Sequence, residues 1–133
     1  MQVDANSFLN TPPSYPWYMC SLVFKWVLEQ GGVTEMDRRA KERSDLLYSA
    51  IDASDFYMNV VDKHVRSRMN VVFNLKDESL CSVFIKEADQ QGLHGLKGHR
   101  SVGGLRASMY NAMPLEGAQA LCDFMRDFEA RYG

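Results

Sequence analysis

Three side chains that can bind anions lie close together near the C-terminal end of the sequence. His99, Arg100 and Arg106 flank the pair Gly103-Gly104. Glycine adopts positive φ without the steric penalty of a Cβ atom, so this pair permits a tight reversal that could bring the three side chains to one ligand. The planar guanidinium of arginine matches carboxylate and phosphate groups. The pattern favours a site for a doubly anionic small molecule, although a basic glycine-containing segment is also typical of a solvated loop before a strand.

The beginning of the chain ends in a pair of prolines. Residues 1–13 contain no periodic apolar pattern, and Pro12-Pro13 cannot continue a helix or a central strand. We therefore expect an arm or loop here. Asn10 and Thr11, which precede the prolines, are typical turn formers when taken alone.

The composition of the chain limits its class. At 133 residues with 46% hydrophobic and 24% charged residues, it has the size and balance of a single soluble globular domain. A net charge of -2 gives no electrostatic reason to bind nucleic acid or a membrane surface. No apolar run could span a bilayer, and the first residues lack the pattern of a signal peptide, so we expect a cytoplasmic protein.

The cysteines show no pattern of a metal or redox site. Cys20, Cys81 and Cys122 are far apart, with no CxxC pair and no spacing typical of metal ligands. Each has apolar neighbours in a helix-like stretch. We predict three reduced thiols in the core and no bound metal.

The first helix is predicted from Ser14, a good N-cap residue, to Glu29 or Gln30, before Gly31-Gly32. Its polar residues form a thin stripe, and apolar residues cover the remaining surface. A helix that is apolar nearly all round is buried on several sides. This one is either an ordinary core helix or a helix that is covered by a missing domain or a partner subunit. Its apolar residues are Tyr15, Trp17, Tyr18, Leu22, Val23, Phe24, Trp26 and Val27.

A second helix is predicted to begin at Thr34, which could form a capping box with Asp37. Its charged residues are most simply interpreted as a solvated face. The residues expected to face a core are Met36, Ala40, Leu47, Ala50 and Ile51. The residues assigned to the solvated face are Arg38, Arg39, Lys41, Glu42, Arg43 and Asp45.

The rest of the chain alternates short strands and helices. Strands are predicted at 56–58, 69–75, 93–96 and 105–110, a third helix from Asp77 or Glu78 to Gln91, and a final helix from Pro114. His64, Arg66 and Arg68 lie between two strands, where no glycine would bring them together, so we expect a surface connection there. The order predicts an α/β fold, a two-layer sandwich in which helices pack on a small mixed or antiparallel sheet.

Five blocks of the sequence form a specific combination. They are LNTPPSYPWYM at 9–19, LVFKW at 22–26, SRMNV at 67–71, LKGHRSVGGLRAS at 96–108 and YNAMPLEG at 110–117. In their order and spacing, they resemble the C-terminal part of the phosphoserine aminotransferases, a family of pyridoxal-phosphate enzymes of serine biosynthesis. The resemblance implies that residues 14–133 are the aminotransferase small domain and that residues 1–13 are an arm belonging with a large domain that is absent here.

The resemblance also implies roles for individual residues. Arg106 would bind the α-carboxylate of the substrate, and His99 and Arg100 would bind the substrate phosphate or the distal carboxylate of glutamate. Asn10 and Thr11 would hydrogen-bond the phosphate of pyridoxal phosphate in the neighbouring subunit of a homodimer, a role that suits an amide and a hydroxyl.

For the complete enzyme, the resemblance implies amino transfer between phosphoserine with 2-oxoglutarate and 3-phosphohydroxypyruvate with glutamate. The lysine that binds the cofactor would precede residue 1, so this chain would contain no catalytic residue. We therefore expect the isolated chain to be inactive. The alternative is a non-catalytic module that uses the same pocket for anion binding or serves dimerisation.

Overall fold

The computed structural model of the protein describes Asp4, Asn6 and residues 8–133. The chain divides into two compact units, Met1–Met36 and Asp37–Gly133. Part of the arm that we predicted at residues 1–13 lies outside the described residues. From Leu9 to Pro13 the backbone forms bends and irregular structure, as the prolines predicted.

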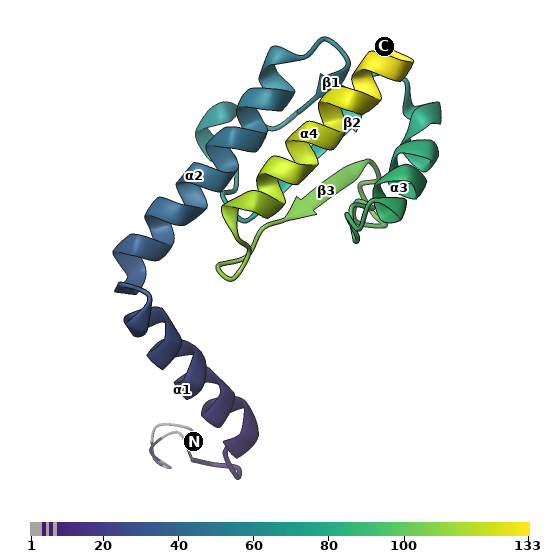
Figure 1. Ribbon diagram of the computed structural model, residues 1–133. Helices are drawn as coiled ribbons and strands as arrows, with labels where there is room; N and C mark the ends of the chain where they lie inside the picture. Colours follow the sequence, from purple (N-terminus) through teal and green to yellow (C-terminus); the bar gives the residue numbers. More distant parts are fainter. Residues whose placement is uncertain (1–3, 5, 7) are drawn as a thin grey trace. The chain divides into compact units, whose positions relative to one another are not determined.

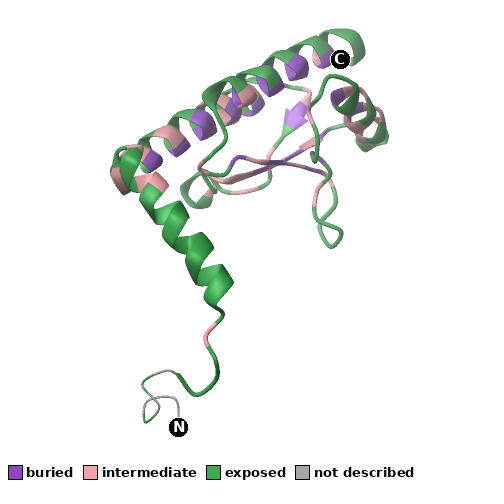
Figure 2. Cartoon of the chain, turned by 60° about the horizontal axis from the view of Figure 1, so that its bottom comes forward, coloured by how far each residue is buried: buried purple, intermediate pink, exposed green. Residues whose placement is uncertain are grey.

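The helix α1 (Ser14–Glu29) has the predicted bounds and is followed by Gly31 and Gly32, both at positive φ. None of its residues is buried, and Figure 2 draws it mostly in green. Phe24 is 66% exposed and Leu28 is 74% exposed. The interpretation as an ordinary core helix is therefore wrong for this chain. Coverage by a missing domain or a partner subunit stays a prediction.

The cysteines were only partly predicted. Cys122 is buried, and burial raises its pKa to about 11, while Cys81 is half-buried. Cys20 is exposed because it lies on α1, where no described residue is buried. The prediction of a core thiol at Cys20 is therefore wrong.

The helix α2 (Gly32–Ala53) begins two residues before the predicted Thr34. Four of the five residues that we expected to face a core are buried, and Ala50 is half-buried. Arg43, which we assigned to the solvated face, is only 2% exposed. It lies three residues after Ala40 and four before Leu47, so the helical period places it on the buried face with both. The residue type misled the prediction, and the spacing would have corrected it.

Three strands form one antiparallel sheet within the described residues, in the order β1 (Tyr57–Met58), β2 (Asn70–Leu75) and β3 (Leu105–Ser108). Along β2, Val71, Phe73 and Leu75 are buried, while the residues between them are half-buried. This alternation gives the sheet one core face, as the period of two predicted. The fold is the expected α/β sandwich with a small antiparallel sheet.

The expected strand at residues 93–96 does not form. A single antiparallel bridge joins Lys97 to Leu105 instead. The physical reason is Gly95, whose φ of 78° interrupts the extended backbone that a strand requires. The strand expected at 105–110 ends at Ser108.

Helices cover the core face of the sheet in the second unit. Figure 1 shows α2 and α4 (Leu115–Tyr132) side by side, and Cys122 of α4 lies 3.9 Å from the carbonyl oxygen of Leu46. The third helix, α3 (Cys81–Gln90), follows the 3₁₀ turn η2 (Glu78–Leu80) and places Phe84 against the ring of Phe128. Both phenylalanines are fully buried, and truncating either to alanine would cost about 3–5 kcal/mol.

The connection between β1 and β2 contains the 3₁₀ turn η1 (Lys63–Val65). Arg66 donates two hydrogen bonds to Asp52, at 2.8 and 2.9 Å, and its guanidinium lies over the ring of Tyr48. Arg68 is paired with Asp37. These ion pairs join the connection to α2, and the interpretation as a surface connection without an anion site stays a prediction.

Candidate functional site

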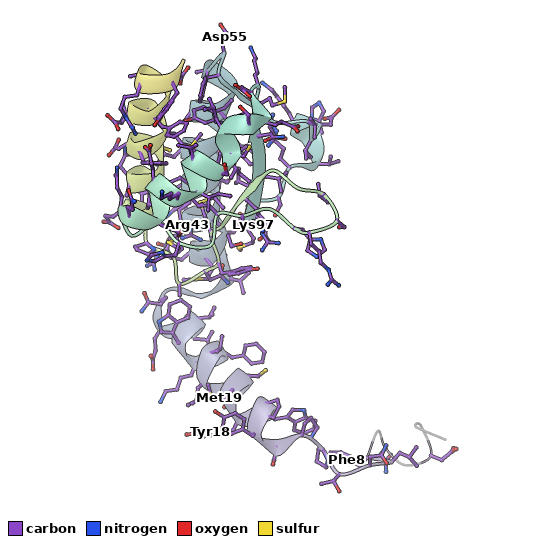
Figure 3. All side chains as sticks on the ribbon, turned by 90° about the vertical axis from the view of Figure 1, so that its right-hand side faces the viewer. Phe8, Tyr18, Met19, Arg43, Asp55 and Lys97 are labelled. Carbon is purple, nitrogen blue, oxygen red and sulfur yellow. The ribbon has the colours of Figure 1, made fainter. Side chains whose placement is uncertain are left out.

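The candidate anion site lies in a hairpin loop that precedes β3. Figure 3 labels Lys97, where the loop begins. The backbone N–H of Gly98 donates to the carbonyl oxygen of Gly104 at 2.9 Å, which closes the loop. Gly103 and Gly104 have φ values of 77° and 64°, so the predicted reversal at this pair is confirmed. Residues with side chains rarely adopt such values.

A third glycine of this loop was missed by the sequence reasoning. Gly98 has no positive φ, but a Cβ atom at this position would lie 2.0 Å from the carbonyl oxygen of Gly103. The two sides of the loop therefore approach each other more closely than any side chain permits. The signal in the sequence was the spacing of glycines on both sides of a short polar loop, which is typical of close backbone approach.

The ring of His99 is exposed and is hydrogen-bonded to Ser101 of the same loop. Its Nδ1 lies 2.7 Å from the hydroxyl oxygen of Ser101. The backbone N–H of Ser101 donates a hydrogen bond of 3.3 Å to the same Nδ1. The carbonyl oxygen of His99 accepts hydrogen bonds from the backbone N–H groups of Val102 and Gly103. Arg100 is exposed and forms no hydrogen bond or ion pair within the described part of the chain. The loop thus presents one fixed ring and one available guanidinium.

Arg106 is positioned by the sheet. It lies in β3 opposite Val72, and its backbone N–H donates to the carbonyl oxygen of Leu96 at 2.8 Å. Its neighbours Leu105 and Ala107 are buried on the core face, so the alternation of the strand puts Arg106 on the other face. Its Nε is buried without an acceptor among the described residues. A buried donor without a partner costs about 1–3 kcal/mol. Because Nε is inaccessible, the donors that an anion could reach are the terminal nitrogens of the guanidinium, which are not among the buried atoms.

The structure places the three predicted basic residues on one continuous segment without joining them by contacts. Within residues 8–133, no hydrogen bond or ion pair connects His99, Arg100 and Arg106. Asn10 and Thr11 belong to the first unit, where both are exposed and neither side chain has a hydrogen-bond partner among the described residues. Their amide and hydroxyl groups are therefore available to a phosphate.

The basic site is open. A pocket of about 260 Å³ adjoins the Gly103-Gly104 turn, and a pocket of about 310 Å³ lies between β3 and the start of α4. Neither is lined by the three basic side chains. No group of acidic, cysteine and histidine side chains that could hold a metal ion occurs among the described residues. With two guanidinium groups and an imidazole, the chemistry that the site supports is the binding and orientation of anionic groups.

Known proteins match nearly the whole of the chain. The model of the family "Aminotransferase class-V" matches residues 2–121. The structure of phosphoserine aminotransferase from Bacillus circulans subsp. alkalophilus is 47% identical, with a TM-score of 0.91 over 99% of this chain and 37% of that one. A PLP-bound phosphoserine aminotransferase from Trichomonas vaginalis is 40% identical, with a TM-score of 0.85 over 94% of this chain and 36% of that one. The chain therefore spans little more than a third of the length of these proteins.

Proposed function

Because the chain belongs to the class-V aminotransferase family, we propose that it is the C-terminal part of a phosphoserine aminotransferase. Residues 14–133 form the small domain, and residues 1–13 are an arm that belongs with a large domain outside this chain. The proposal is supported by the 47% identity to a phosphoserine aminotransferase over 99% of the chain. The complete enzyme moves an amino group between phosphoserine with 2-oxoglutarate and 3-phosphohydroxypyruvate with glutamate, a step of serine biosynthesis.

The observation that carries the substrate assignment is Arg106. Its guanidinium has no hydrogen-bond or ion-pair partner in the described chain, its terminal nitrogens are not among the buried atoms, and it lies on the strand that follows the loop with His99 and Arg100. Arg106 binds the α-carboxylate that every amino-acid substrate carries, because its planar fork donates two parallel hydrogen bonds. His99 and Arg100 bind the second anionic group, which is the phosphate of phosphoserine or the distal carboxylate of glutamate.

These three side chains bind and orient the substrate, and none of them transfers a proton. Two anchors on opposite ends of a small molecule fix its position and its rotation, so the bond to be broken is held in one place. Selectivity follows from the second anchor. Amino acids without a second anionic group leave Arg100 without an acceptor and bind more weakly.

Asn10 and Thr11 fit a role at the cofactor. Both side chains are exposed and have no partner in the described part of the chain, and both can donate a hydrogen bond to a phosphate oxygen. In the proposed homodimer, they hold the phosphate of pyridoxal phosphate in the neighbouring subunit. The cofactor supplies the electron sink for amino transfer when it is bound to the complete enzyme.

We place the enzyme in the cytoplasm, the default compartment for this composition. No helix in residues 8–133 has the length and apolar character needed to cross a membrane.

The test is an assay of the complete protein that contains this sequence. We expect amino transfer from phosphoserine to 2-oxoglutarate, a large loss of activity in Arg106→Ala and no loss in Lys86→Ala, a change at an exposed position of α3. Activity with other amino donors but none with phosphoserine would overturn the proposal. The isolated chain with added pyridoxal phosphate should show no turnover above that of the free cofactor.

The alternative function, a non-catalytic anion-binding or dimerisation module, is favoured only by the exposed apolar surface of α1. Stable monomers rarely expose apolar patches beyond a few hundred Å². We expect the isolated chain to self-associate and to bind an apolar dye, and Phe24→Ser should reduce both. The outcome that distinguishes the two functions is the activity of the complete protein, because a module would have none.

A further inference from the structure

The hydrogen bonds of Ser101 determine which nitrogen of His99 carries the hydrogen. A backbone N–H can only donate, so the Nδ1 that lies 3.3 Å from the Ser101 nitrogen must offer a lone pair. Because Nδ1 has a single lone pair, the Ser101 hydroxyl at 2.7 Å shares that lone pair with the backbone N–H as the second donor of a three-centre hydrogen bond. In a neutral imidazole whose Nδ1 accepts, the hydrogen resides on Nε2.

The loop holds Ser101 where it can make both contacts. The backbone N–H groups of Val102 and Gly103 donate to the carbonyl oxygen of His99 at 2.9 and 2.8 Å, so residues 99–103 form a closed turn. The hydrogen bond of 2.9 Å between Gly98 and Gly104 closes the loop around it. Nε2 of His99 has no hydrogen-bond partner among the described residues.

We propose that Ser101 is a positioning residue that holds His99 as a neutral Nε2–H donor for the second anionic group of the substrate. This inference rests on the proposed function for the role of His99 as a ligand. An Nε2–H group can donate a hydrogen bond to a phosphate or carboxylate oxygen. The fixed charge at the site comes from Arg100, and His99 supplies direction.

The other two histidines of the chain provide internal standards. Nδ1 of His94 lies 3.1 Å from a carboxylate oxygen of Asp89, which can only accept, so His94 carries its hydrogen on Nδ1. The ring of His64 has no hydrogen-bond partner in the described part of the chain, so neither nitrogen is favoured by a contact. The three rings should therefore report three different tautomer states.

The experiment is nitrogen NMR of the uniformly labelled chain, at a pH at which imidazole is neutral. We expect an unprotonated Nδ1 and a protonated Nε2 for His99, the reverse for His94, and for His64 the mixture of a ring without partners, in which Nε2–H is the major but not the only form. In Ser101→Ala the His99 signals should shift toward those of His64, whereas Ser101→Thr keeps the hydroxyl and should retain the wild-type pattern. A proton on Nδ1 of His99, or an unchanged pattern in Ser101→Ala, would overturn the role of Ser101.

A kinetic measurement on the complete enzyme separates this inference from the proposed function. Ser101→Ala should raise the KM for phosphoserine about three- to tenfold, the range of one hydrogen bond, with kcat unchanged, and Ser101→Thr should restore it. An unchanged KM in His99→Ala overturns the role of His99 in the proposed function. An unchanged KM in Ser101→Ala, with a large effect in His99→Ala, overturns only the inference about Ser101.

Discussion

Gly98 lies so close to Gly103 that a Cβ atom on Gly98 would be 2.0 Å from the carbonyl oxygen of Gly103 and 2.7 Å from that of Gly104. Both neighbours are backbone atoms, which cannot rotate away as a side chain could. The same closeness allows the backbone N–H of Gly98 to donate to Gly104. The loop that carries His99 and Arg100 therefore depends on a glycine at its entrance.

We predict that Gly98→Ala opens this loop. Forcing a methyl group into a packed position costs typically about 1–3 kcal/mol, and we expect the upper end because backbone must move. Chemical denaturation of the isolated chain would measure the change in the free energy of unfolding. In the complete enzyme, kcat/KM for phosphoserine should fall at least about tenfold, because His99 and Arg100 lose their position.

Gly117→Ala is the matched control. A Cβ atom on Gly117 would meet only the flexible side chain of Met113, and Gly117 has no positive φ. Alanine favours a helix over glycine by up to about 1 kcal/mol, so this variant should be as stable as the wild type or slightly more stable. Equal losses in the two variants would mean that the entrance of the loop is not special.

Periodicity predicted the parts of the fold in which side chains alternate between core and solvent. The pattern of Val71, Phe73 and Leu75 predicted β2 and its buried face, and the helical spacing predicted the core residues of α2. The Gly103-Gly104 reversal was predictable because positive φ is a local property of glycine. The need for glycine at position 98 was not predictable, since it arises from the backbone of Gly103 and Gly104 on the other side of the loop.

Arg43 shows where residue type and position disagree. Its position predicts burial and its charge predicts exposure, and the structure follows its position. Its Nε and one terminal nitrogen are buried without partners among the described residues. Burial is the main cause that lowers the pKa of Arg43 below its ordinary value, and the positive charge of Arg39 lowers it further. The isolated second unit thus contains a buried cation without a described hydrogen-bond partner for two of its donors.

Replacing this cation should stabilise the isolated chain. Arg43→Met keeps an unbranched apolar stem and removes the unpartnered donors, so the free energy of unfolding should rise by about 1–3 kcal/mol. Lys86→Met, at an exposed position of α3, should change it by less than about 0.5 kcal/mol. Thermal or chemical denaturation measures both. A destabilised Arg43→Met chain would mean that the guanidinium has an acceptor in solution.

The pair of Arg66 and Asp52 should make stability depend on pH. The hydrogen bonds from Arg66, and a further one from Lys63, hold the pKa of Asp52 below its ordinary value. A carboxylate with a lowered folded-state pKa stabilises the fold above its unfolded-state value and loses this contribution as the pH falls through the folded-state value. The pair therefore stabilises the fold near neutral pH and not in strong acid.

The prediction for Asp52→Asn follows from that sign. The variant should lose about 1 kcal/mol near neutral pH, a modest value because the carboxylate is partly exposed. The difference from wild type should shrink as the pH falls through the lowered folded-state pKa of Asp52. Asp45→Asn, which removes an exposed pair with Lys41, should lose less. Denaturation curves at several pH values measure the difference in the free energy of unfolding between wild type and Asp52→Asn. A difference that is independent of pH would contradict the lowered pKa of Asp52.

Substitutions of the two arginines of the candidate site should affect the two half-reactions of the complete enzyme differently. If Arg106 binds the α-carboxylate, Arg106→Ala should impair the half-reactions of phosphoserine and glutamate alike. Arg106→Lys should restore little, because an ammonium cannot reproduce the planar fork. Arg100→Ala should weaken phosphoserine more than glutamate, since phosphate carries more charge. A charged hydrogen bond contributes about 1.5–3 kcal/mol, which corresponds to about tenfold or more in kcat/KM.

Single-turnover measurements of kcat/KM for each half-reaction decide between these assignments. Arg126→Ala, an exposed change on α4, is the control for a general loss of positive charge and should leave both half-reactions unchanged. Equal losses for phosphoserine and glutamate in Arg100→Ala would show that Arg100 is not the residue that binds the phosphate. An intact glutamate half-reaction in Arg106→Ala would show that Arg106 does not bind the α-carboxylate, because glutamate carries that group as phosphoserine does.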